Sequence, residues 1–154
     1  MLVAAGLLAG HPGGDTATAT PLDFTLAPGT WLGLAGGNGS GKTALLLTLA
    51  GLAPARSGSV TIDGHPAGSA AARALVGVVF QEPETQFVTD RVARELAFPL
   101  ENLGRPRAEI EARVQELLRE FELAALADAP PDRLSGGEMQ RVALAAAAAP
   151  RPRY

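Results

Sequence analysis

The sequence predicts an α/β fold, because its first half places short apolar strands around a leucine-rich helix. Residues 22–26 alternate apolar and polar side chains, a period typical of a half-buried strand. Residues 75–80 are continuously apolar, as strands buried on both faces tend to be. Residues 42–52 lie between them and are good helix formers, so strands and a helix share one segment of the chain.

Each further element of the first half follows from a local signal. The N-terminus is apolar and has no basic residue before Lys42, which favours a buried strand over a signal peptide. Turn residues at Pro28 and Gly29, and again at Asp63 and Gly64, separate the strands. In chain order, we expect strands within residues 1–10, 22–26 and 31–35, the helix at 42–52, and strands at 59–62 and 75–80.

After Gln81 the hydrophobic periodicity becomes helical. Residues 91–100 and 106–123 carry apolar side chains at spacings of three and four, and Pro106 suits a first helical turn. One face of the second segment gathers Ile110, Val114, Leu117, Leu118 and Phe121. The charged residues elsewhere on this segment are interpreted as a solvated surface rather than a partner contact. Residues 82–134 are therefore predicted to form a helical insert.

Composition excludes several classes of protein. The chain has 154 residues, of which 47% are hydrophobic and 19% charged, which suits a folded domain with a core. Its net charge of -3 lacks the basic excess of a nucleic-acid binder, so no nucleic acid partner is expected. Without cysteine, the chain can form neither disulfides nor thiolate metal sites. No apolar run reaches about 20 residues, so we expect a soluble chain or a peripheral subunit.

Residues 36–43 match the phosphate-loop pattern of glycine, four residues, glycine, lysine and then serine or threonine. Glycines let backbone N–H groups turn toward a phosphate, and the following helix presents its positive end to it. Lys42, the only lysine of the chain, would reach the β- and γ-phosphates, while Thr43 would bind Mg²⁺. The candidate binding residues are Gly36, Gly37, Asn38, Gly39, Ser40, Gly41, Lys42, Thr43 and Ala44. The pattern predicts binding of a nucleoside triphosphate.

A second candidate anion site lies near the end of the chain. Ser135, Gly136 and Gly137 precede a helix-forming segment at residues 139–145, and serine is a favoured N-cap. Taken alone, this is an ordinary helix start. Downstream of a phosphate loop it gains a second interpretation, as a phosphate contact at a helix N-terminus.

Together, the phosphate loop, Gln81 after a buried strand, and residues 134–138 resemble the Walker A motif, Q-loop and signature of ATP-binding-cassette (ABC) ATPases. Residues 78–87, with 95–98 and 101–104, are similar more narrowly to the ATPase subunits of energy-coupling-factor importers. The resemblance implies a P-loop NTPase (RecA-like) core with N-terminal antiparallel strands and an inserted helical subdomain. Its implied divisions are a nucleotide-binding core at 1–81, a helical subdomain at 82–134, and the signature helix with the start of a further strand at 135–154.

The resemblance also implies a site for ATP and Mg²⁺ that two ATPase subunits share. The signature of one subunit would contact the γ-phosphate held by the other, and its residues are Ser135, Gly136 and Gly137. Gln81 would touch Mg²⁺ and the attacking water. Gln81 and Lys42 are thus the catalytic candidates, and Thr43 and Gln81 the metal ligands. His11 stands where the family usually has an aromatic residue that stacks on adenine.

The function that the resemblance implies is an ATP-binding subunit of a membrane importer, peripheral at the cytoplasmic face. It would couple ATP binding and hydrolysis to import of a vitamin or a transition-metal ion. Its partners would be a second ATPase subunit and an integral membrane subunit that docks at residues 81–87. The alternatives are a soluble ATP-dependent switch outside transport and a nucleotide-binding fragment without catalysis.

The sequence departs from the family pattern at its C-terminus. Family members continue beyond an Arg-Pro-Arg-aromatic segment, here residues 151–154, into a strand ending in Asp-Glu and then a switch histidine. The sequence ends at Tyr154, before their positions. We therefore expect a C-terminally truncated ATPase whose fold is incomplete there and which can bind ATP without turnover.

Overall fold

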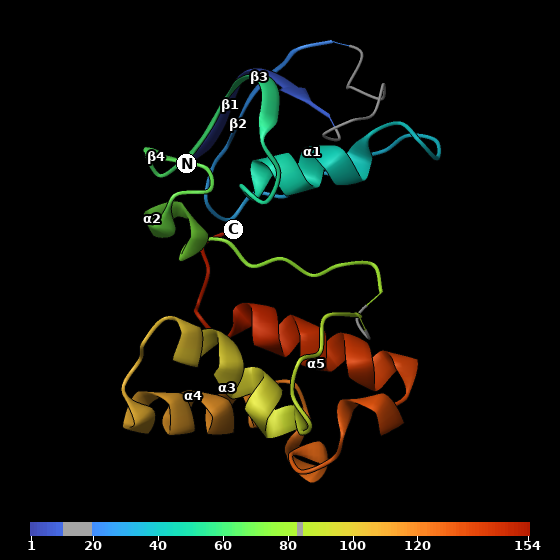
Figure 1. The fold of residues 1–154 in the computed structure, drawn as a ribbon, viewed down its shortest axis with the longest axis vertical. Coiled ribbons are helices and arrows are strands. Elements are labelled where there is room, and N and C mark those ends of the chain that lie inside the picture. The colour runs from blue at the N-terminus through green and yellow to red at the C-terminus, as the bar shows by residue number, and fades with distance from the viewer. Residues whose placement is uncertain (11–19, 83–84) are drawn as a thin grey trace. The chain divides into compact units, whose positions relative to one another are not determined.

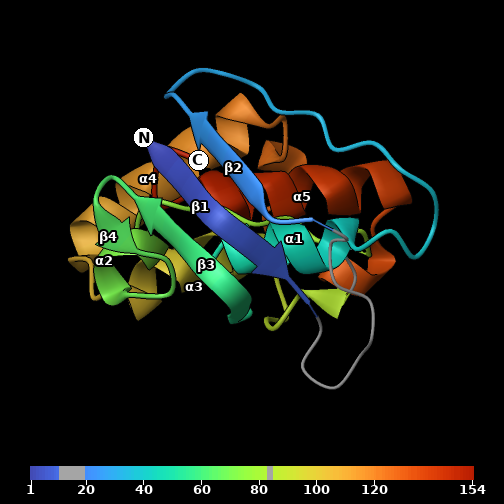
Figure 2. The ribbon, with the colours of Figure 1, turned by 90° about the horizontal axis from the view of Figure 1, so that it is seen from above.

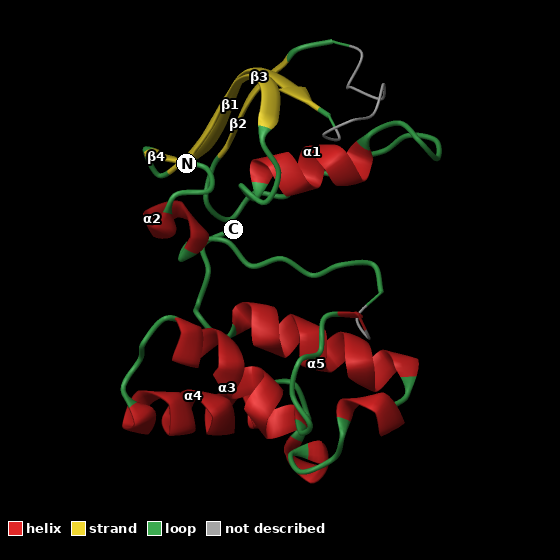
Figure 3. Ribbon diagram, in the orientation of Figure 1, coloured by secondary structure: helices red, strands yellow, loops and turns green. Residues whose placement is uncertain are grey.

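The chain folds into two compact units, each of which is described by itself. The computed structural model describes residues 1–10, 20–82 and 85–154. The sheet unit comprises residues 1–76 and 153–154, and the helical unit comprises residues 77–152. The strands belong to the sheet unit, and the three longest helices of the second half belong to the helical unit (Figures 1 and 3).

The sheet unit is built on a four-stranded antiparallel sheet. Its elements are β1 (Leu2–Ala9), β2 (Leu22–Leu26), α1 (Lys42–Leu49), β3 (Ala55–Ile62), β4 (His65–Pro66) and α2 (Ala70–Arg73). The strand order is β2-β1-β3-β4, and Val3 of β1 pairs with Thr25 of β2 and with Thr61 of β3. The predicted N-terminal antiparallel strands and the helix after the phosphate loop are confirmed.

Helix α1 lies against the sheet (Figures 1 and 2), and one apolar core joins the two. Leu45 and Leu49 of α1 are buried in one apolar cluster with Leu7 of β1 and Ile62 of β3, both of which are fully buried. Burial of such side chains stabilises the fold by about 1.5–3 kcal/mol each. This packing fixes α1, whose first residue is Lys42.

The chain returns to the sheet unit at its last two residues. The backbone N–H groups of Arg153 and Tyr154 both donate to the Leu75 carbonyl, at 2.9 and 3.0 Å. The Arg153 guanidinium also donates to the Asp63 carboxylate at 2.7 Å. These contacts explain why residues 153–154 group with the sheet unit rather than with the helix that precedes them.

The strands predicted at residues 31–35 and 75–80 are wrong. Neither segment pairs with a strand in the part of the chain that the structure describes. Trp31 is 99% exposed and Phe80 44% exposed, so apolar side chains expected inside a sheet are open to solvent. An apolar run becomes a strand only where a neighbouring backbone satisfies its N–H and C=O groups. Hydrophobicity predicted these strands, but they do not form because neither segment pairs with another strand among the described residues.

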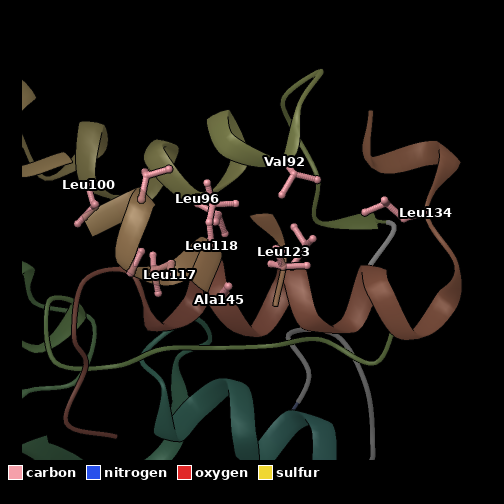
Figure 4. Packing of buried hydrophobic residues seen from close by; sticks show 11 residues of the cluster. Val92, Leu96, Leu100, Leu117, Leu118, Leu123, Leu134 and Ala145 are labelled. Carbon is pink, nitrogen blue, oxygen red and sulfur yellow. The ribbon is translucent and has the colours of Figure 1, made fainter. Parts of the chain in front are cut away.

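The helical unit packs three amphipathic helices around one core. Its elements are α3 (Val92–Asn102), α4 (Arg107–Glu120), the short 3-10 helices η2 (Ala124–Leu126) and η3 (Pro131–Arg133), and α5 (Gly136–Ala148). α3 packs against both α4 and α5. Leu96, Leu117 and Leu118 are buried together in this core (Figure 4). The apolar face predicted for residues 106–123 is confirmed by the burial of its central leucines.

None of the helices formed by the described residues is long and apolar enough to cross a membrane. The functional divisions predicted at residues 81 and 134 stay predictions.

Candidate functional site

The phosphate-loop segment lies directly before α1 in the sheet unit. Gly39 has a φ of +78° and Gly41, the N-cap of α1, a φ of +86°. Glycine adopts this left-handed conformation without the steric penalty that other residues meet. Residues 36–40 are exposed, and the positive end of α1 adjoins them. The local sequence thus produces an open loop beside a helix N-terminus, which is the geometry of an anion site.

The side chain of Lys42 folds back over this loop. Its Nζ donates to the Gly36 carbonyl at 2.9 Å and to the Gly37 carbonyl at 2.8 Å, and lies 3.4 Å from the Ser40 hydroxyl oxygen. An ammonium has three donors and no acceptor, so these oxygens hold it against the loop. Phosphate oxygens that enter the loop would meet a cation that is already in place.

The structure places the other predicted site residues in different parts of the chain. Thr43 is exposed in the first turn of α1, in the same unit as Lys42. Gln81 is exposed and belongs to the helical unit, as does the signature. His11, the predicted adenine contact, lies outside the described residues. The predicted phosphate-loop residues therefore lie in the sheet unit, and Gln81 and the predicted signature in the helical unit.

The signature part is a capped helix start. Ser135 is the N-cap of α5, and its hydroxyl donates to Glu138 Oε2 at 2.6 Å. The Ser135 N–H donates to the same oxygen at 2.8 Å, and the Glu138 N–H points back at the Ser135 hydroxyl at 3.4 Å. This reciprocal capping box leaves Gly136 and Gly137 exposed in the first turn, where backbone N–H groups have no intrahelical acceptor. The predicted helix start at Ser135 is confirmed, and its phosphate contact stays a prediction.

The hydrogen bonds from the Ser135 hydroxyl and backbone, with the positive charge of Arg141, lower the pKa of the Glu138 carboxyl below its ordinary value of 4.5. A carboxyl whose pKa is lowered by folding stabilises the fold above its unfolded pKa and loses that contribution as the pH falls through the folded pKa. The start of α5 should therefore be ordered at neutral pH and loosen in acid, as the pH falls below the ordinary pKa of 4.5 and through the lowered pKa of Glu138.

We expect the amide signals of Gly136 and Gly137 to report this loosening in a pH titration by NMR. Glu138→Gln should abolish the acid transition, because glutamine can form the same capping box without titrating. Ser135→Ala should destabilise the fold by about 1 kcal/mol through loss of the cap. An acid transition at these glycines that persists in the glutamine variant would assign it to another group.

Glu95 is a structural residue that the sequence interpretation missed. It is buried on α3, with 5% of its surface exposed, and its carboxylate accepts hydrogen bonds from the Thr89 N–H and hydroxyl, at 2.9 and 2.8 Å. The Val88 N–H donates to it as well, at 3.1 Å. Glu95 thereby anchors the chain just after the predicted docking segment at residues 81–87. The sequence does place Glu95 beside Leu96, which belongs to the apolar face of this helix. A carboxylate buried there needs hydrogen-bond donors, so this position could have predicted its structural role.

A glycine-rich loop at the start of a helix, with a lysine held over it, defines a nucleotide-binding domain of the P-loop class. The particular family follows from comparison with known proteins. The pattern of the family described as ABC transporter matches residues 19–154, and the chain belongs to that family.

Individual relatives agree with the narrower resemblance. The energy-coupling factor transporter ATP-binding protein EcfA1 of Lactiplantibacillus plantarum is 43% identical over 141 residues, covering 90% of this chain and 50% of its own length. A putative ABC transporter ATP-binding protein of Halobacterium salinarum is 46% identical over 144 residues, covering 92% of this chain and 62% of its own length. The predicted similarity to energy-coupling-factor ATPase subunits is confirmed. The chain spans about half to three fifths of the length of these relatives.

A solved structure supports the same fold. The structure of cbiO1 from Clostridium perfringens, described as part of the ABC transporter complex cbiONQ, matches with a TM-score of 0.81 at 29% identity. The match covers 98% of this chain and 62% of that one. The predicted P-loop NTPase fold is therefore confirmed.

Proposed function

We propose that this chain provides the ATP-binding part of a membrane importer of the energy-coupling-factor type. The observation that carries the proposal is the loop of residues 36–41 with Lys42 held over it, in a chain of the ABC transporter family. The first-turn N–H groups of α1 and the Lys42 ammonium would bind the β- and γ-phosphates of ATP. Adenine would stack on His11.

Mg²⁺ fits the groups that the chain offers. Thr43 presents an exposed hydroxyl beside the loop, and Gln81 an exposed amide oxygen in the other unit. Mg²⁺ prefers oxygen ligands and is commonly held by few protein groups together with substrate phosphates. When bound, the ion would neutralise charge on the phosphates during transfer. Thr43 and Gln81 would orient it, and Gln81 would also orient the attacking water.

The signature would complete the site on another ATPase subunit. Ser135, Gly136 and Gly137 are exposed at the positive end of α5, which can receive a γ-phosphate held by a partner. Since phosphoryl transfer depends mainly on positioning and charge stabilisation, a site assembled by closure of two subunits would link hydrolysis to movement. That link would drive import of a vitamin or a transition-metal ion.

The membrane subunit would dock beside residues 81–87 at the cytoplasmic face. Val88, which follows this segment in the chain, is 63% exposed. Covering an exposed apolar side chain is favourable, so Val88 suits a contact with an apolar side chain of a docked helix.

Two measurements test the proposal. Isothermal titration with MgATP should show binding, and absence of binding would refute the nucleotide assignment.

Co-expression with a multi-helix membrane protein encoded beside the gene should yield a complex, which Val88→Asp should weaken about tenfold by placing a charge in the interface. Leu52→Asp is the matched control, because Leu52 is similarly exposed, at 53%, in the sheet unit. Unchanged complex formation by the Val88 variant would refute the docking surface.

A further inference from the structure

We infer that Arg113 is a positioning residue that sets the orientation of the signature helix from its far end. Arg113 belongs to α4, yet its guanidinium donates to the last carbonyls of α5, with Nη2 at 2.9 Å from Ala148 O and Nε at 3.2 Å from Ala149 O. Only 13% of its side chain is exposed. The inference rests on the proposed role of Ser135, Gly136 and Gly137.

Arg113 is held rigidly enough to act as an anchor. Its Nη1 lies 2.9 Å from Glu116 Oε2 and 3.7 Å from Glu120 Oε2, both on the same helix. The guanidinium is a planar fork whose donors form several directed bonds at once. A cation at a helix C-terminus also complements the helix dipole. The end of α5 is therefore bonded to a side chain that α4 itself immobilises.

A second tie reaches the segment that follows α5. Arg151 has a left-handed φ of +57°, and its Nη2 donates to Glu116 Oε2 at 2.8 Å. The guanidinium groups of Arg113 and Arg151 lower the pKa of the Glu116 carboxyl, so it stays ionised at neutral pH and bonds to both. Glu116 thus joins the two arginines into one network across the C-terminal end of α5.

The C-terminal end of α5 is buried on one side, where Ala145 and Ala149 belong to the apolar core, and borders a surface hollow on another. A hollow of about 400 Å³ lies there, lined by residues that include Leu100, Ala112, Arg113, Ala149 and Pro150. A hollow that is open to solvent supplies no packed side chains on that side of the helix. The polar network therefore restrains α5 beside the hollow, in addition to the buried alanines and the packing against α3.

A tilt at the C-terminal end of α5 would displace the signature residues at its N-terminal end. α5 has 13 residues and is therefore about 20 Å long. A tilt of about 5° at one end displaces the other end by about 1.7 Å over that length. A misplacement of about 1 Å in a catalytic group can reduce a rate by about 100-fold. Arg113 can thus influence Gly136 and Gly137 without contacting nucleotide.

The test measures the orientation of α5 directly. Residual dipolar couplings should show that α5 tilts relative to α3 in Arg113→Gln, and less so in Arg113→Lys, which keeps the charge but loses the fork. Arg107→Gln is the matched control, because Arg107 is exposed on α4 and pairs within that helix with Glu111. An unchanged α5 axis in both Arg113 variants would overturn the inference, even if their melting temperatures fall. If Arg113→Gln does not fold, the same couplings are measured in Arg113→Lys and Glu116→Gln. A tilt of α5 in these variants would support the inference, and an unchanged axis would overturn it.

A functional readout separates this inference from the proposed function. ATP affinity measured by titration should stay within about twofold in the Arg113 variants, because Arg113 bonds to residues of α4 and to the end of α5 rather than to the phosphate loop. ATP-dependent association of two copies of the chain should weaken about tenfold. Association equal to that of the wild type would overturn the inference. Failure of the wild-type chain to bind ATP would instead refute the proposed function, and the dipolar couplings would still decide the role of Arg113.

Discussion

Replacing Lys42 with alanine is expected to weaken MgATP binding by about 100-fold, the largest effect of any single change at the proposed site. The Lys42 ammonium lies over the loop, between 2.8 and 2.9 Å from the Gly36 and Gly37 carbonyls, where phosphate oxygens would enter. A hydrogen bond to a charged group contributes about 1.5–3 kcal/mol, and two of them at the lower end of that range, about 3 kcal/mol, correspond to about two orders of magnitude in affinity. Isothermal titration with MgATP measures the loss.

Lys42→Arg should also impair binding, because a broad planar guanidinium cannot occupy the position of a compact ammonium in a loop of this size. Arg73→Gln serves as the control for the same unit, since Arg73 is exposed on α2 and remote in sequence from the loop. The thermal midpoint of each variant should match that of the wild type within a few degrees, because the hydrogen bonds of the Lys42 ammonium are with the exposed loop. Wild-type affinity in the arginine variant would contradict the steric argument.

The elements that the sequence predicted well are those set by neighbours along the chain. The turn into α1 requires glycine at position 41, and the cap of α5 requires a side chain like that of Ser135, so both helix starts could be located from residue types alone. The apolar face of α4 follows from side-chain spacing in the same way. Each of these signals is complete within a few residues.

The strands predicted at residues 31–35 and 75–80 failed for the opposite reason. Their apolar composition satisfies a strand pattern, but strand formation depends on hydrogen bonds to a distant segment, which a single sequence does not reveal. Arg113 was likewise assigned to a solvated face, although its guanidinium is largely buried against the end of α5. The sequence shows that Arg113 is charged. It does not show that the guanidinium donates to the Ala148 carbonyl, 35 residues further along the chain.

Glu95→Ala should destabilise the helical unit by about 3 kcal/mol, the largest effect expected on stability among these variants. The buried carboxylate accepts hydrogen bonds from the Val88 N–H, the Thr89 N–H and the Thr89 hydroxyl, and alanine would leave these donors without their acceptor. An unsatisfied buried donor costs about 1–3 kcal/mol, and partial access of water would reduce the sum. Urea unfolding followed by helical circular dichroism measures the change.

The same substitution should loosen the chain beside the docking segment before it unfolds the unit. Hydrogen exchange at Val88 and Thr89 should therefore accelerate more than exchange at Leu117, which is fully buried in the core. Glu101→Ala is the matched control, because Glu101 is exposed on the same helix, and its stability should stay within about 0.5 kcal/mol of the wild type. Equal effects of the two substitutions would show that burial and hydrogen bonding of Glu95 do not anchor this segment. A selective effect of Glu95→Ala would establish that a carboxylate on α3 holds the backbone next to the surface proposed for the membrane subunit.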